Sequence, residues 1–194
     1  MPLVASFAKP VGLFDNWFNK VTAVVTGHGG NFCHSEFVFS FTVDRMKEFL
    51  KHVEEDIKKW EKKLERYEEN GMIHLCFFIV WGNNVSYRLL KYGHNNPYFK
   101  YPNENEFSLI KLKNITEEEE FRVGKFLMDQ IKKEYDYVGA LAFFLPMRGQ
   151  EPCYNKWFCS QLMVASLQHI NRLKDINPAG ITPNYLYKLL LVSY

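Results

Sequence analysis

The chain has 194 residues, of which 47% are hydrophobic and 16% aromatic, and its 24 basic and 22 acidic residues leave a formal net charge of +2. Length and composition are typical of a single globular domain spanning 1–194, without internal repeats or low-complexity tracts. No block of Lys and Arg stands without acidic neighbours, so nucleic acid is not an expected partner.

The first predicted elements are a short helix and a strand that carries a histidine. Apolar residues recur at helical spacing over 13–25, and the Gly-rich segment that follows is a loop by composition. The run 32–41 is rich in aromatic and branched residues, which predicts a core strand. Because side chains alternate along a strand, His34 and Glu36 share one face, where the carboxylate could orient the imidazole. The alternative is a polar pair facing solvent on an edge strand.

Residues 44–70 predict one long amphipathic helix. Its apolar residues, spaced alternately four and three positions apart with Lys and Glu between them, are Met46, Leu50, Val53, Ile57, Trp60, Leu64 and Tyr67. At 1.5 Å per residue such a helix would be roughly 40 Å long, more than the core of this domain requires. We therefore interpret 44–70 as a helical insertion that either packs on the domain or projects as an arm for self-association or for a protein partner.

Further strands and a helix fill the middle of the chain. Strands are predicted over 73–81 and 85–90, joined by a turn, and over 107–112. Thr116 and the three glutamates after it form a capping box, which predicts a helix that begins there and ends near Tyr135.

The residue with the clearest chemical potential is Cys159, at the start of a predicted helix. Apolar residues recur at helical spacing from Leu162 to Ile170, which puts Cys159 in the first turn. Unpaired backbone N–H groups and the positive end of the helix dipole meet there, so the pKa of the thiol should fall below its free value of about 8.5. The alternative is a buried cysteine that serves as a small apolar residue. Thr182-Pro183, a cap and a first turn, predict one more helix near the end.

The other cysteines and the apolar runs exclude several classes of protein. Cys33, Cys76, Cys153 and Cys159 are scattered without CxxC spacing, which argues against a disulfide scaffold and a zinc site. We expect no metal and no cofactor, and a reducing compartment: the cytoplasm, or the virion or host cytosol if the source is a virus. No stretch reaches the roughly 20 apolar residues of a membrane span, so no integral membrane segment is expected.

Five segments together resemble a known family. They are His34-Ser35-Glu36, the acidic helix opened by Thr116, Tyr135-Asp136-Tyr137, Phe158-Cys159-Ser160-Gln161-Leu162, and Thr182-Pro183-Asn184-Tyr185-Leu186. In this order they resemble the circularly permuted papain-like cysteine hydrolases, the permuted branch of the NlpC-type superfamily, in which the histidine strand precedes the cysteine helix. The resemblance covers about 13–190. The chain departs from the family in the 44–70 insertion and at Gln161, where an acidic residue is common.

The resemblance implies an α+β fold whose antiparallel sheet packs against the cysteine-bearing helix. It also implies a site that cleaves an amide or ester bond in a peptide, isopeptide or lipid-like substrate. By this resemblance Cys159 is the nucleophile, His34 the general base and acid, and Glu36 the orienting residue.

Three aromatic residues are candidates for the substrate pocket, and two rival functions stay open. Tyr135 and Tyr137 are candidate hydrogen-bond donors or pocket walls, and Trp157 is a further pocket candidate, with plain core packing as the alternative. A lipid acyltransferase or thioesterase would use the same cysteine and histidine, and the apolar segment 138–145 supports it. A non-catalytic interaction protein would instead work through 44–70.

Overall fold

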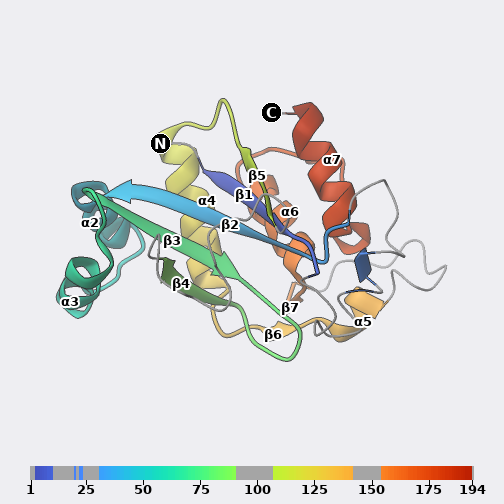
Figure 1. Cartoon of the computed structure of the whole chain (residues 1–194), viewed down its shortest axis with the longest axis horizontal. Helices are drawn as coiled ribbons and strands as arrows, with labels where there is room; N and C mark the ends of the chain where they lie inside the picture. Colours follow the sequence, from blue (N-terminus) through green and yellow to red (C-terminus); the bar gives the residue numbers. More distant parts are fainter. Residues whose placement is uncertain are drawn as a thin grey trace.

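The computed structural model describes residues 3–10, 20, 22–23, 31–90, 107–141 and 154–193. In chain order the elements are β1 (Val4–Ala8), β2 (His34–Thr42), α2 (Val43–His52), α3 (Ile57–Tyr67), β3 (Met72–Phe78), β4 (Ser86–Leu90), β5 (Phe107–Lys111), α4 (Glu117–Asp129), β6 (Glu134–Tyr135), α5 (Tyr137–Leu141), β7 (Lys156–Trp157), α6 (Cys159–Gln168), the 3-10 helix η2 (Pro178–Gly180) and α7 (Pro183–Ser193). Five of the strands form one antiparallel sheet (Figure 1). The predicted α+β class and the antiparallel sheet are confirmed.

The predicted histidine strand, β2, lies at the centre of the sheet. The strand order is β4-β3-β2-β1-β5, so β2 pairs with a neighbour along both edges. Glu36 lies opposite Ser6 of β1, and both side chains are buried. The alternative of an exposed polar pair on an edge strand is therefore wrong.

The sequence reading missed β1, although this strand separates β2 from β5. It is only five residues long, and its three middle residues, Ala5, Ser6 and Phe7, are all buried, so burial does not alternate along it. A short stretch of this kind has little periodicity to detect. β1 fixes the start of β2, because Ala8 lies opposite His34.

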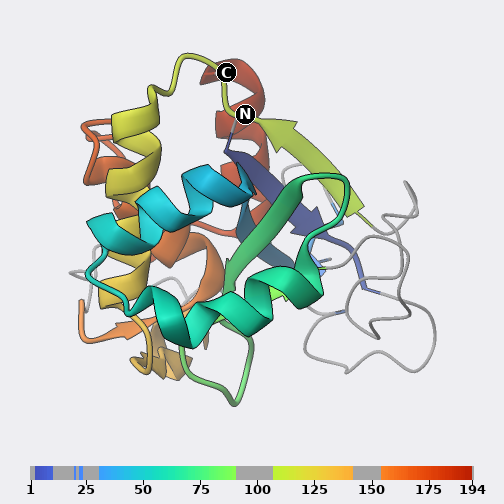
Figure 2. The same ribbon diagram turned by 90° about the vertical axis from the view of Figure 1, so that its left-hand side faces the viewer.

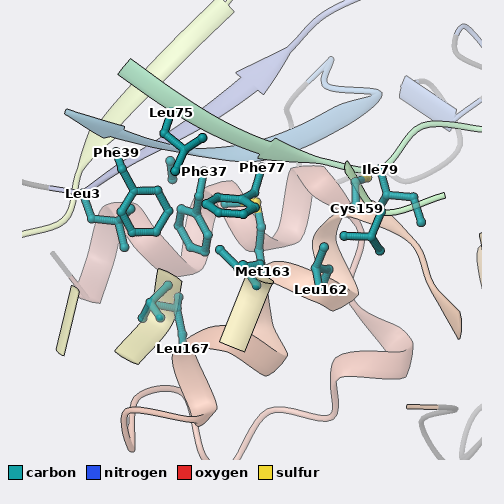
Figure 3. Close-up of a cluster of buried hydrophobic side chains, with 14 of the residues drawn as sticks. Leu3, Phe37, Phe39, Leu75, Phe77, Ile79, Cys159, Leu162, Met163 and Leu167 are labelled. Atoms are coloured by element: carbon teal, nitrogen blue, oxygen red, sulfur yellow. The ribbon is translucent and has the colours of Figure 1, made fainter. Parts of the chain in front are cut away.

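The core lies between the sheet and α6. Figure 3 shows the side chains of Phe37, Phe39 and Phe77 pointing from the strands toward Met163 and Leu167 on the helix. The rings of Phe39 and Phe77 meet edge to face, with centroids 5.5 Å apart. Each such side chain contributes roughly 1.5–3 kcal/mol by its burial. This packing fixes α6 against β2, so Cys159 lies at the end of the cluster (Figure 3).

Residues 44–70 do not form one continuous helix, and that prediction is wrong. α2 and α3 are separate helices, and between them Glu54 has a φ of 61°, in the left-handed region that interrupts a right-handed helix. Asp56 starts α3, because its carboxylate accepts a hydrogen bond from the backbone N of Lys58 at 3.1 Å.

The apolar residues of 44–70 pack on the domain. Figure 2 shows α2 and α3 as two rods joined by a bend. The buried members of the predicted stripe are Met46, Leu50, Val53, Trp60 and Leu64. The packed alternative is therefore confirmed, and the projecting arm is not formed.

The remaining predicted elements differ from the structure mainly at their ends. The capping box is confirmed, because Thr116 and Glu119 exchange backbone and side-chain hydrogen bonds of 2.9 and 3.1 Å. The helix it starts ends at Asp129 rather than near Tyr135, and Lys132 follows with a φ of 73°. The link between β3 and β4 is longer than the predicted turn.

Some expectations concern other parts of the chain. Of the predicted helix at 13–25, residues 20, 22 and 23 are described and are helical, and the rest lies outside the described residues. Residues 142–145, the second half of the apolar segment 138–145, also lie outside the described residues. Among the helices of the described residues, none has the length and apolar character needed to cross a membrane.

Candidate active site

Cys159 is the first residue of α6, as the sequence predicted. Phe158 is the N-cap, and its backbone N–H donates to Oε1 of Gln161 at 3.4 Å, which orders the first turn. The thiol is 8% exposed. Its sulfur therefore meets the positive end of the helix dipole in surroundings that largely exclude water.

His34 and Cys159 are close enough for each to shift the pKa of the other, so the two groups lie in one site. Burial alone would raise the pKa of Cys159, but the hydrogen bond and charge of His34 and the backbone N–H of Ser35 lower it below its ordinary value. Burial alone would lower the pKa of His34, but its hydrogen bonds to Cys159 and Glu36 raise it from 6.5 to about 9. Both shifts favour the charged forms, a thiolate beside an imidazolium.

Glu36 is the second residue that contacts His34. Its Oε2 is 3.4 Å from Nε2 of the imidazole, and the residue is 2% exposed. The same oxygen accepts a hydrogen bond of 2.8 Å from Nη2 of Arg88 on β4. His34 and Arg88 thus both contact the carboxylate of Glu36. The carboxylate is placed to orient the imidazole and to stabilise its charged form.

Sequence reasoning did not single out Arg88. The only local signal is a cation in the middle of a predicted strand. Its partner is 52 positions earlier in the sequence, and the pairing of β4 with β3 and of β3 with β2 brings the two together. Cys76 of β3, the strand between β2 and β4, lies opposite Arg88 in the sheet. Burial, and after it the charge of Glu36, raises the pKa of the Cys76 thiol well above its ordinary value.

Asn184 ties α7 to the segment that leads into the histidine strand. Its Oδ1 accepts a hydrogen bond from the backbone N of Phe32 at 2.8 Å, and its Nδ2 donates to the carbonyl of Ala23 at 3.3 Å. The residue is completely buried. Phe32 is two positions before His34, so this bond sets where β2 begins.

Ser160 ties the cysteine helix to the same region. Its hydroxyl donates to the carbonyl of Ile181 at 2.5 Å, one residue before the cap of α7. The segment 181–184 therefore holds both the strand with His34 and the helix with Cys159. The sequence marked this segment only through the Thr-Pro helix start and the family resemblance.

Replacing Asn184 with Ala should destabilise the protein by about 1–3 kcal/mol, because it leaves the buried N–H of Phe32 without its acceptor. Denaturant unfolding followed by circular dichroism measures this loss. Asn177→Ala is a matched control, since Asn177 also accepts a backbone hydrogen bond but at an exposed turn. Equal losses in the two variants would contradict the role given to Asn184.

Two of the pocket candidates, Tyr135 and Tyr137, lie together near the thiol. Their ring centroids are 5.2 Å apart, and Trp81 lies 5.4 Å from the first and 4.8 Å from the second. Burial raises the pKa of Tyr135, and the nearby charge of Cys159 adds to the effect. Tyr137 is 41% exposed, so it is placed to contact a substrate.

The third pocket candidate, Trp157, packs in the core. It is 1% exposed, and its Nε1–H donates to Oε1 of Gln130 at 3.2 Å. Its ring also meets the ring of Phe126 on α4 edge to face. Trp157 therefore supports the start of α6 from behind and does not present a surface to a substrate.

The short helix α5 places an apolar surface near the start of α6. β6 pairs in parallel with β7, which brings α5 next to the start of α6. Gly139 of α5 lies so close to Phe158 that an added Cβ would be 3.1 Å from its ring. Val138 and Leu141 of α5 are 68% and 43% exposed. An exposed apolar surface thus lies on the helix that packs against Phe158, the residue before the candidate nucleophile.

Among the described residues, no three His, Cys, Asp or Glu side chains gather as the ligands of a metal ion would. Comparisons of the chain with protein-family models, with curated proteins and with solved structures found no match. The site is therefore interpreted from the geometry and chemistry of its own side chains.

Proposed function

We propose that this protein is a permuted papain-like cysteine hydrolase that cleaves an amide or ester bond through an acyl-enzyme on Cys159. The observation that carries the proposal is the pairing of Cys159, at the start of α6, with His34, each of which shifts the pKa of the other toward its charged form. A lowered thiol pKa beside a raised imidazole pKa is the arrangement that activates a cysteine nucleophile. Glu36 supports it as the orienting group.

The chemistry follows in two halves. The Cys159 thiolate attacks the substrate carbonyl carbon, and the electron pair of the C=O bond moves to its oxygen. When the tetrahedral intermediate collapses, the bond to the leaving amine or alcohol breaks and the His34 imidazolium gives that group its proton. Neutral His34 then takes a proton from water, whose oxygen attacks the thioester. Release of the acid restores the thiolate and the imidazolium.

The negative oxygen of each tetrahedral intermediate needs hydrogen-bond donors. The backbone N–H of Cys159 is at the N-terminus of α6, where no earlier turn of the helix supplies an acceptor. An oxyanion above the first turn would also be stabilised by the helix dipole. We assign this N–H as one donor of the oxyanion hole.

A lipid acyltransferase or thioesterase is the second candidate function. It is favoured by the exposed apolar side chains of Tyr137, Val138 and Leu141 on α5, the helix that packs against Phe158 next to Cys159. A long acyl chain on the substrate would gain free energy by covering this surface. The third alternative, an interaction protein working through 44–70, loses its support because the apolar stripe is used inside the domain.

p-Nitrophenyl acetate tests the acyl-enzyme directly. We expect a burst of nitrophenol that matches the protein concentration, and an acetyl group that peptide mass spectrometry locates on Cys159. Cys159→Ala should abolish both, and Cys33→Ser, which keeps the hydrogen bond to the Ala8 carbonyl, should retain them. Acetylation spread over several cysteines without a burst would exclude the proposed function.

A series of acyl chain lengths separates the two candidate functions. Rates that rise steeply from acetyl to decanoyl esters would favour a lipid substrate, and transfer to an added alcohol or amine would identify an acyltransferase. Similar rates for all chain lengths, with water as the acceptor, would favour the amide or peptide hydrolase.

A further inference from the structure

We propose that the groove between α3 and β4 binds a phosphate-bearing small molecule. The groove has a volume of about 510 Å³, within the range of pockets that hold small ligands. Its described lining residues are Lys62, Lys63, Arg66, Tyr67, Tyr87, Arg88 and Leu89. Four of these side chains are cationic, and no acid occurs among them.

The side of α3 that faces the groove carries basic residues and no acid. At 100° per residue, Lys59, Lys63 and Arg66 fall on one side of the buried positions Trp60 and Leu64. Lys62 lies opposite the buried positions, and Lys58 lies on the other side. The acids of α3, Glu61 and Glu65, fall on the other side. The helix carries five basic and two acidic residues, and only basic ones line the groove.

Aromatic side chains hold part of this cationic surface in place. The rings of Trp60 and Tyr87 stack with centroids 5.1 Å apart. Nζ of Lys63 lies 5.1 Å and 5.7 Å from these two ring centroids, and it donates to the Tyr87 hydroxyl at 3.5 Å. The guanidinium of Arg66 lies over the ring of Tyr67. Donors that are already positioned lose less entropy when a ligand binds.

The number and arrangement of donors favour phosphate over a carboxylate. Lys62, Lys63 and Arg66 come from α3, and Tyr87, whose hydroxyl is a further donor, comes from β4, so the donors approach from two sides. A phosphate monoester offers about two negative charges and three strong acceptor oxygens, and can bond donors on both sides at once. A single carboxylate offers one charge and two oxygens. The rings of Tyr67 and Tyr87 and the side chain of Leu89 provide an apolar wall for an organic group.

The groove touches the candidate active site through Arg88. Arg88 is one of the residues that line the groove, and its guanidinium donates to Oε2 of Glu36, which contacts His34. A phosphate bound in the groove would therefore lie next to the residue that stabilises Glu36. The binding site itself does not depend on the proposed function, because none of its cations takes part in the acyl transfer.

Titration calorimetry with inorganic pyrophosphate, at about 0.1 M ionic strength where weak surface charges are screened, tests the site. We expect saturable binding to the full-length protein with one site per chain. Lys62→Glu with Arg66→Glu should weaken it by at least about tenfold, because two charge-assisted donors are lost. The control, Lys47→Glu with Lys174→Glu, makes the same change in net charge at exposed positions outside the groove and should bind like the wild type.

The source of the phosphate is resolved by a second arm with phosphatidylcholine vesicles that contain phosphatidic acid. Vesicle binding that the groove variant loses and the control keeps, without binding of pyrophosphate, would assign the phosphate to a lipid headgroup. Equal weakening in both variants would show diffuse charge attraction and overturn the site. Absence of binding in both arms would overturn it as well. None of these measurements requires turnover. A failure of the phosphate site can therefore be told apart from a failure of the proposed hydrolase function.

Discussion

Replacing His34 with Gln should slow the alkylation of Cys159 by iodoacetamide at pH 7 by about 10–100-fold, because each unit by which the thiol pKa rises above the pH removes about nine tenths of the remaining thiolate. In the wild-type protein the hydrogen bond and charge of His34 outweigh burial and lower the pKa of Cys159. Without the imidazolium, burial dominates and the pKa rises. Site-resolved mass spectrometry over a pH series measures the rate at each cysteine.

Cys76 is the internal control for this experiment. Burial raises the pKa of its thiol, so it should react slowly at pH 7 in both proteins. Cys159 of the wild type should react fastest, and His34→Gln should reach comparable rates only in alkaline solution. Similar profiles for Cys159 in the two proteins would contradict the thiolate–imidazolium pair.

The same ion pair predicts different pH profiles for alkylation and for turnover. Alkylation needs only the thiolate, so its rate rises through the lowered pKa of Cys159 and stays high. Turnover also needs the proton on His34, whose pKa is raised to about 9. Turnover should therefore fall as the pH rises through about 9, while alkylation does not. Such a difference separates an activated nucleophile from a working acid and base.

The features predicted well from the sequence are those set by residues close together in the chain. The start of α6 at Cys159 follows from helical spacing, and the capping box follows from Thr116 and the glutamates beside it. The shared face of His34 and Glu36 follows from the alternation of a strand. Each pattern spans only a few residues, so no knowledge of the tertiary fold is needed.

The features that were missed depend on distant partners or on an unusual backbone. Arg88 and Asn184 form hydrogen bonds with Glu36 and Phe32, which are 52 and 152 positions away in the sequence. No local sequence pattern indicates those contacts. The break between α2 and α3 has a different cause. The apolar spacing continues from Val53 to Trp60 through the bend, and the residue in the left-handed region is Glu54 rather than Gly. The spacing therefore indicated one helix where the chain turns to keep both halves on the core.

Replacing Arg88 with Met should destabilise the fold by about 3 kcal/mol, because removing one partner leaves a buried charge without its compensation. Glu36 is almost completely buried and loses its 2.8 Å hydrogen bond to the guanidinium. Of its charged contacts in the described part of the chain, the one to His34 at 3.4 Å is retained. Chemical denaturation at pH 7 measures the change in the free energy of unfolding.

A double variant shows whether this loss comes from the ion pair. Glu36→Gln with Arg88→Met removes both charges, so it should be more stable than the sum of the two single losses predicts, by about 1–3 kcal/mol. Additive losses would mean that Arg88 stabilises through packing, since its guanidinium also lies 4.4 Å from the ring centroid of Phe78. In that case Arg88 would support the sheet without holding Glu36, and the orientation of His34 would depend on Glu36 alone.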